Sequence, residues 1–115
     1  MAVAGQLARY DNLRSLGFAS ISGVYAGVGP TFTHPVRILT IDNFTDANLI
    51  ISFNGVNDMT VIHSMSSKVI DYASNKILPI GLLEQPAGDR VYIREESGAP
   101  TLGNFYVTVV WAATV

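Results

Sequence analysis

The chain has 115 residues, of which 49% are hydrophobic and only 14% are charged. An average soluble domain is about 25% charged, so this composition predicts apolar surface that is covered by association with other proteins. The absence of cysteine excludes thiol catalysis and thiolate metal sites. The net charge of −2, with seven scattered Lys and Arg, argues against nucleic acid as a ligand.

A chain of this length fits one domain with one core. A membrane span needs about 20 consecutive apolar residues, and the longest comparable run, residues 107–115, is shorter and includes Thr108 and Thr114. Residues 1–16 lack the basic and apolar blocks of a secretory signal. We therefore expect no membrane as a partner and a protein that stays where it is made.

The first 17 residues form a segment of their own. Apolar residues recur there at spacings of three and four, at Val3, Leu7, Tyr10, Leu13 and Leu16. This spacing is compatible with a short amphipathic helix, and an irregular arm that docks on a neighbour is an equal alternative. We expect residues 1–17 to act between subunits and residues 18–115 to form a β domain.

Strand patterns follow in chain order. Residues 18–32 suit an edge strand that leads into a Gly-rich loop, and β-branched alternation predicts a strand over residues 36–41. Further strands are predicted over residues 47–53, 59–63, 68–73, 90–95 and 105–111, with a broken edge strand over residues 77–83. The breaks between them imply two hairpins in the middle of the chain and a long hairpin at its end.

About seven to eight short strands separated by Gly, Pro, Asn and Asp loops predict an antiparallel all-β domain, either a β-sandwich or a jelly roll. Alternation along the last strand places Val107, Val109 and Trp111 on one face. We expect this face to pack against Ile38 or Ile51 of the facing sheet.

Few residues are candidates for metal binding or acid–base catalysis. His34 and His63 lie apart from other candidate ligands, so a surface or capping role is the stronger interpretation and a metal or acid–base role the weaker. Asp42, Asp46 and Asp58 fall in loops but lack the spacing of a calcium loop, and they are better explained as residues that end strands. The sequence therefore predicts no metal and no other cofactor.

Catalytic arrangements are also lacking. The neighbours Glu95 and Glu96 point to opposite faces of a strand, and no Ser lies in a Gly-x-Ser-x-Gly elbow. Aromatic residues lie inside predicted strands, where core or intersubunit packing is their usual role: Phe53, Tyr92, Phe105, Tyr106 and Trp111. We expect a protein that is not an enzyme and has no catalytic residues, with a carbohydrate-binding module as the runner-up.

Several phrases of the sequence resemble a group of small structural proteins encoded in the virion modules of tailed bacteriophages. The resemblance runs from about Leu13 to Trp111. Its phrases are the residues 13–25, 34–38, 42–47, 51–58 and 100–107. The sequence departs from the pattern at residues 59–67, where Ser64-Met65-Ser66-Ser67 replaces an expected Pro-Ala-Gly-like turn.

The resemblance implies a virion component that is assembled in the cytoplasm of the bacterial host. It implies a homo-oligomer that also contacts another virion protein, such as the major capsid, neck or tail protein. A capsid cement or decoration protein, or a component of the head–tail connector, is the first hypothesis. A tail-associated receptor- or carbohydrate-binding β-sandwich module is the alternative. The resemblance transfers no site residues to this chain.

Overall fold

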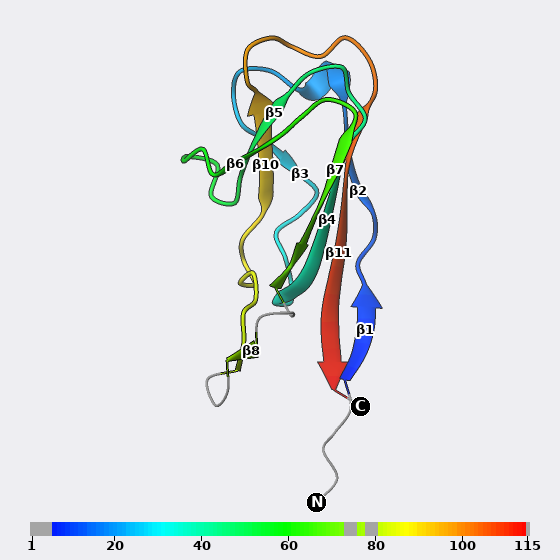
Figure 1. Cartoon of the computed structure of the whole chain (residues 1–115), viewed down its shortest axis with the longest axis vertical. Coiled ribbons are helices and arrows are strands. Elements are labelled where there is room, and N and C mark those ends of the chain that lie inside the picture. The colour runs from blue at the N-terminus through cyan, green and yellow to red at the C-terminus, as the bar shows by residue number, and fades with distance from the viewer. Residues whose placement is uncertain (1–5, 73–75, 78–80, 115) are drawn as a thin grey trace, which may run out of the picture.

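A computed structural model describes residues 6–72, 76–77 and 81–114 and shows two antiparallel β-sheets packed face to face (Figure 1). Sheet A contains β1 (Gln6–Tyr10), β2 (Arg14–Gly17), β4 (Val36–Asn43), β7 (Ser66–Asp71) and β11 (Asn104–Thr114). Sheet B contains β3 (Ala26–Val28), β5 (Leu49–Ser52), β6 (Thr60–Ile62) and β10 (Val91–Glu95). The predicted antiparallel all-β sandwich is confirmed.

The strand order gives the sandwich a jelly-roll connectivity. Sheet A runs β2-β11-β4-β7, with β1 beside β11 on the same edge as β2, and sheet B runs β3-β10-β5-β6. From β2 onward, every connection between consecutive strands of these two sheets crosses from one sheet to the other, except β5 to β6, whereas β1 and β2 follow each other within sheet A. Two four-stranded sheets linked in this way make a jelly roll.

The predicted hairpins are confirmed only in part. Of the two hairpins expected in the middle of the chain, the one at Asn54–Gly55 joins β5 to β6. The second is wrong, because β4 and β5, like β6 and β7, lie in different sheets. The long terminal hairpin is wrong, because β10 pairs with β3 and β5 whereas β11 pairs with β1, β2 and β4. Both strands carry fully buried residues, such as Ile93 and Val107, and they bury these side chains against each other from opposite layers.

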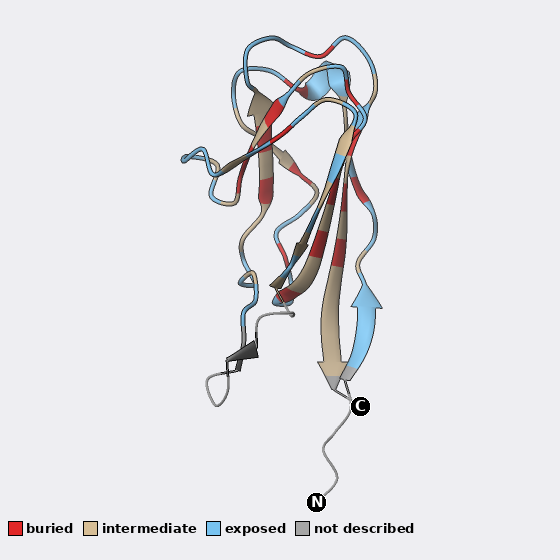
Figure 2. Ribbon diagram, in the orientation of Figure 1, coloured by how far each residue is buried: buried red, intermediate tan, exposed pale blue. Residues whose placement is uncertain are grey.

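The core lies between the two sheets, as the buried segments in Figure 2 show. Val107 and Val109 of β11 are buried on one face and share a core cluster with Ile51 of the facing sheet, as expected. Ile38 is a correction. It lies beside β11 in the same sheet, opposite Val110, and the buried neighbours of this pair, Leu39 and Val109, take the inner face.

Of the two alternatives for residues 1–17, a short helix or an irregular arm, the helix is wrong for the described residues, because β1 and β2 are strands that pair with β11. Leu16 packs against the core and Arg14 is buried, so β2 belongs to the domain itself and the expected boundary at residue 17 does not hold. Residues 1–5 of the expected arm lie outside the described residues. Long-range pairing with β11 has overridden the local helical spacing.

The two other irregular segments hold short elements. A 3₁₀-helix, Phe18–Ser20, precedes β3, which forms the expected edge strand of residues 18–32. In the expected broken strand, β8 (Lys76–Ile77) and β9 (Gly81–Leu82) pair with each other, and residues 78–80 lie outside the described residues. These short pieces lie next to the sandwich and leave its two sheets intact (Figure 1).

Candidate functional site

A buried arginine lies where the start of sheet A meets the loop that follows β3. The side chain of Arg14 is only 5% exposed. Its Nη1 donates to Asp11 Oδ2 at 3.4 Å, its Nη2 donates to the Pro30 carbonyl at 3.5 Å, and its guanidinium lies over the Phe32 ring. Its Nε has no hydrogen-bond partner among the described residues. The two long hydrogen bonds therefore compensate only weakly for the cost of burying the charged guanidinium.

An open pocket of about 480 Å³ lies beside this arginine. Hydroxyl and amide side chains line much of it, and its walls are Asp11, Asn12, Leu13, Arg14, Ser15, Gly29, Pro30, Thr31 and Thr33. The described part of this lining has no aromatic ring. It can offer hydrogen bonds to a polar group, but it offers no flat surface for stacking.

Trp111 connects this region to the end of β11. Its indole Nε1 donates to Asp11 Oδ1 at 3.1 Å, and its ring stacks on the His34 imidazole with a centroid distance of 3.6 Å and an interplanar angle of 3°. The expectation that Trp111 packs in the core with Val107 and Val109 is wrong, because the pairing of β11 with β4 shifts register between Val110 and Trp111, and Trp111 is half-buried beyond the central core. His34 is exposed and covers Trp111, a role that the sequence spacing could not reveal.

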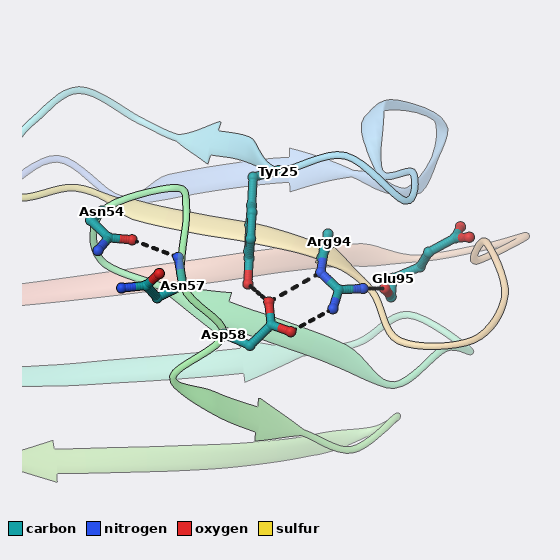
Figure 3. A network of polar contacts seen from close by, with 6 residues as sticks. All are labelled: Tyr25, Asn54, Asn57, Asp58, Arg94 and Glu95. Carbon is teal, nitrogen blue, oxygen red and sulfur yellow. Dashed lines mark hydrogen bonds and ion pairs between the residues drawn. The ribbon is translucent and has the colours of Figure 1, made fainter.

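A second polar cluster lies on the outside of sheet B (Figure 3). The guanidinium of Arg94 donates to both carboxylate oxygens of Asp58, from Nη2 at 2.7 Å and from Nε at 3.3 Å, and its Nη1 donates to the Glu95 carbonyl. The Tyr25 hydroxyl donates to Asp58 Oδ1, and Arg94 lies over the Tyr25 ring. This cluster fastens the β5–β6 turn to β10 and to the segment before β3.

The charges of this cluster stabilise one another. Hydrogen bonds from Arg94, and then from Tyr25, lower the pKa of Asp58. Burial, followed by the hydrogen bond to Asp58, raises the pKa of the Tyr25 hydroxyl. The polar groups of Asp58 and Arg94 are thus engaged with each other, and the arrangement is that of a structural clasp.

The three loop aspartates do not come together. The carboxylate of Asp42 accepts from Ser67 at 2.5 Å, that of Asp46 accepts from Thr101, and that of Asp58 accepts from Arg94. Within the described ranges, no group of three His, Asp or Glu side chains is placed to hold a metal ion. Each aspartate instead joins a loop or strand to a distant segment.

Asn43 is a buried hub that the sequence pattern did not single out. Its Nδ2 donates to the carbonyls of Ala47 and His63 at 2.9 Å and 3.1 Å, and its Oδ1 accepts from the N–H and hydroxyl of Thr45. These bonds fix the loop after β4 against the end of β6. The side chain of His63 itself is exposed.

The outer face of sheet A carries neighbouring uncharged side chains on four strands. Register places Tyr10, Val110 and Ile38 in one row across β1, β11 and β4. A second row holds Thr108, Thr40 and Val69. We call these six residues the outer apolar face. Tyr10 is 72% exposed and Val69 is 64% exposed. None of the six residues is charged, and Asp71 of β7 lies next to Ile38 at the end of the first row.

Comparison of the chain with protein-family models, with curated proteins and with solved structures finds no match. No helix in the part of the chain that the structure describes is long and apolar enough to cross a membrane.

Proposed function

We propose that this chain is a structural subunit of a tailed-bacteriophage virion, acting as a capsid cement or decoration protein or as a component of the head–tail neck. It works by associating with copies of itself and by docking on other virion proteins, without catalysis. The outer apolar face of sheet A is the observation that carries the proposal.

In an antiparallel sandwich, one face of each sheet is normally solvated and polar. Here β-branched, aromatic and uncharged residues continue across β1, β11, β4 and β7. Burial of apolar surface on a partner contributes about 25 cal/mol for each Å² removed from water. A face of this composition favours docking, which also accounts for the low charge content of the whole chain.

The jelly-roll connectivity agrees with this assignment, since viral capsid domains use this fold. Lectins use it as well, and a fold alone does not assign a function. The pocket beside Arg14 favours the tail-associated receptor- or carbohydrate-binding module as the second candidate, because its lining is rich in hydroxyl and amide groups. We rank it second because sugar sites commonly stack the sugar on an aromatic ring, and this pocket has none.

Quantitative mass spectrometry and electron microscopy of purified particles test the proposal. We expect the chain at a fixed copy number in the virion, with the outer apolar face against another virion protein or another copy. Val69→Lys places a charge on this face and should reduce incorporation. Val56→Lys is the matched control, because Val56 is 77% exposed in the β5–β6 turn, away from the face. Absence of the chain from the particle, or equal incorporation of both variants, would overturn the proposal.

A further inference from the structure

The β1 strand has a free edge. It pairs with β11 on one side, and no strand of the described residues pairs with its other side. β4 pairs with β11 only as far as Trp111, so β1 and the end of β11 continue as a two-stranded ribbon (Figure 1). Figure 2 shows β1 exposed over residues 7–10. An isolated two-stranded ribbon is only marginally stable in water.

One hydrogen bond fixes which backbone groups face this edge. The Asp11 N–H donates to the Val109 carbonyl at 3.1 Å, in register with the pairs of β1 and β11. Opposite residues in an antiparallel ladder alternate between hydrogen-bonded and non-hydrogen-bonded pairs. Arg9 and Leu7 therefore bond to β11, whereas the N–H and C=O groups of Gln6, Ala8 and Tyr10 point to the free edge.

We propose that two copies of this chain join through their β1 strands, antiparallel and about a two-fold axis at Ala8. This inference rests on the proposed self-association and names its partner and geometry. Gln6, Ala8 and Tyr10 are symmetric about Ala8, so every outward backbone group of one copy meets its complement on the other. Sheet A then continues from one copy into the next through an isologous contact.

The side chains of β1 suit this register. The small Ala8 residues face each other at the axis, and Leu7 of one copy lies opposite Arg9 of the other. The aliphatic stem of an arginine can cover a leucine, and no like charges stand directly opposite each other. Leu7 is 40% exposed in the single chain, and Arg9 of the other copy covers it in the dimer. The Tyr10 side chains of the two copies extend the outer apolar face across the joint.

The opposite edge of sheet A is protected. Lys68 of β7 reaches across to β6, where its Nζ donates to Thr60 Oγ1 at 2.8 Å and to the Val61 carbonyl at 3.2 Å. A lysine on an edge strand is a common device against edge-to-edge pairing. The described residues of β1 contain no proline and no lysine. The contrast selects β1 as the joining edge.

Ala8→Pro tests the proposal selectively. It removes only an N–H that points outward, and proline is tolerated on an edge strand in that orientation. Light scattering after size-exclusion chromatography should give a dimer mass, or a multiple of it, for the wild-type chain and half that mass for Ala8→Pro. Val69→Lys on the β7 side should leave the dimer intact. A monomeric wild-type chain, or a dimer that Val69→Lys disrupts and Ala8→Pro does not, would overturn the inference.

A second variant covers the case in which Ala8→Pro unfolds. The chain has no cysteine, so Ala8→Cys introduces a single thiol. Directly opposite Cα atoms in a hydrogen-bonded pair are about 5.5 Å apart, which lies within disulfide range. Mild oxidation should give disulfide-linked dimers of Ala8→Cys and not of Val69→Cys. The reverse pattern, or equal cross-linking of both, contradicts the β1 joint.

A wild-type chain that is monomeric yet incorporated into particles would refute this joint and leave the proposed function standing.

Discussion

The indole Nε1 of Trp111 donates a hydrogen bond to Asp11, which lies 100 positions earlier in the chain. The bond holds the turn between β1 and β2 against β11, and the stacked His34 covers the indole ring. Together they close the end of the sandwich at which the β1–β11 ribbon begins.

Substitution of Trp111 should separate these two contacts. Trp111→Ala loses the hydrogen bond and the stacked ring, and we expect the free energy of unfolding to fall by about 2–3 kcal/mol. Trp111→Phe keeps an aromatic ring for His34 and should lose about 1 kcal/mol. Urea unfolding followed by circular dichroism measures both losses. Equal losses for the two variants would mean that the ring contact contributes nothing.

Asp11 and Arg14 should differ in their effect on stability. Asp11→Asn leaves the buried guanidinium without its counter-charge and should lower the free energy of unfolding by about 2 kcal/mol. Arg14→Met replaces a poorly compensated charge with an apolar side chain and should remain within about 1 kcal/mol of the wild type. The same urea titrations compare them. A greater loss for Arg14→Met than for Asp11→Asn would contradict this account of the buried charge.

A glycine in the crossing from β10 to β11 is indispensable to the backbone. Gly103 has φ +91°, and a Cβ at this position would lie 1.9 Å from the Phe44 carbonyl oxygen. Gly103→Ala should therefore lower stability by about 3 kcal/mol. Gly98→Ala lies in the same crossing, meets no atom within 4 Å, and should change stability by less than about 0.5 kcal/mol. Thermal melts of the two variants provide the comparison.

Acid should weaken two loop contacts. Hydrogen bonds from Thr101 lower the pKa of Asp46, and Arg94 lowers that of Asp58. Both carboxylates therefore stabilise the fold above the ordinary aspartate pKa of about 3.9, and this contribution is lost as the pH falls through their lowered pKa values. The melting temperature of a double Asp46→Asn, Asp58→Asn variant should depend less on pH below about 4. A variant that keeps the full wild-type pH dependence would show that other groups control acid unfolding.

The central strands were predictable because local pattern and tertiary environment agree there. Alternation in residues 36–41 and 105–111 matches burial of Leu39, Ile41 and Val107 in the structure. The choice between hairpin and crossover was not predictable in the same way. The turn residues within positions 96–103 predicted a hairpin between two paired strands. Burial of β10 and β11 against each other instead requires these two strands to lie in opposite sheets.

The N-terminal strands and the candidate sites depend on partners far away in the sequence. Apolar spacing around Leu7, Tyr10 and Leu13 fits a helix, and only the pairing with β11 converts it into a strand. The stack of His34 on Trp111 and the clasp of Arg94 on Asp58 join residues dozens of positions apart. No spacing rule within one strand or loop could have brought these pairs together.

The position of β11 also determines when the molecule can fold during synthesis. β1 and β2 lie at the start of the chain, yet their described pairing is with β11, the last strand in chain order. A ribosome must therefore complete residues 104–114 before either strand finds its partner in sheet A. Non-local pairing of this kind makes folding slow. It also means that a nascent chain cannot present a formed β1 edge before residues 104–114 have been made, so the proposed joining of copies through that edge has to follow the pairing of β1 with β11.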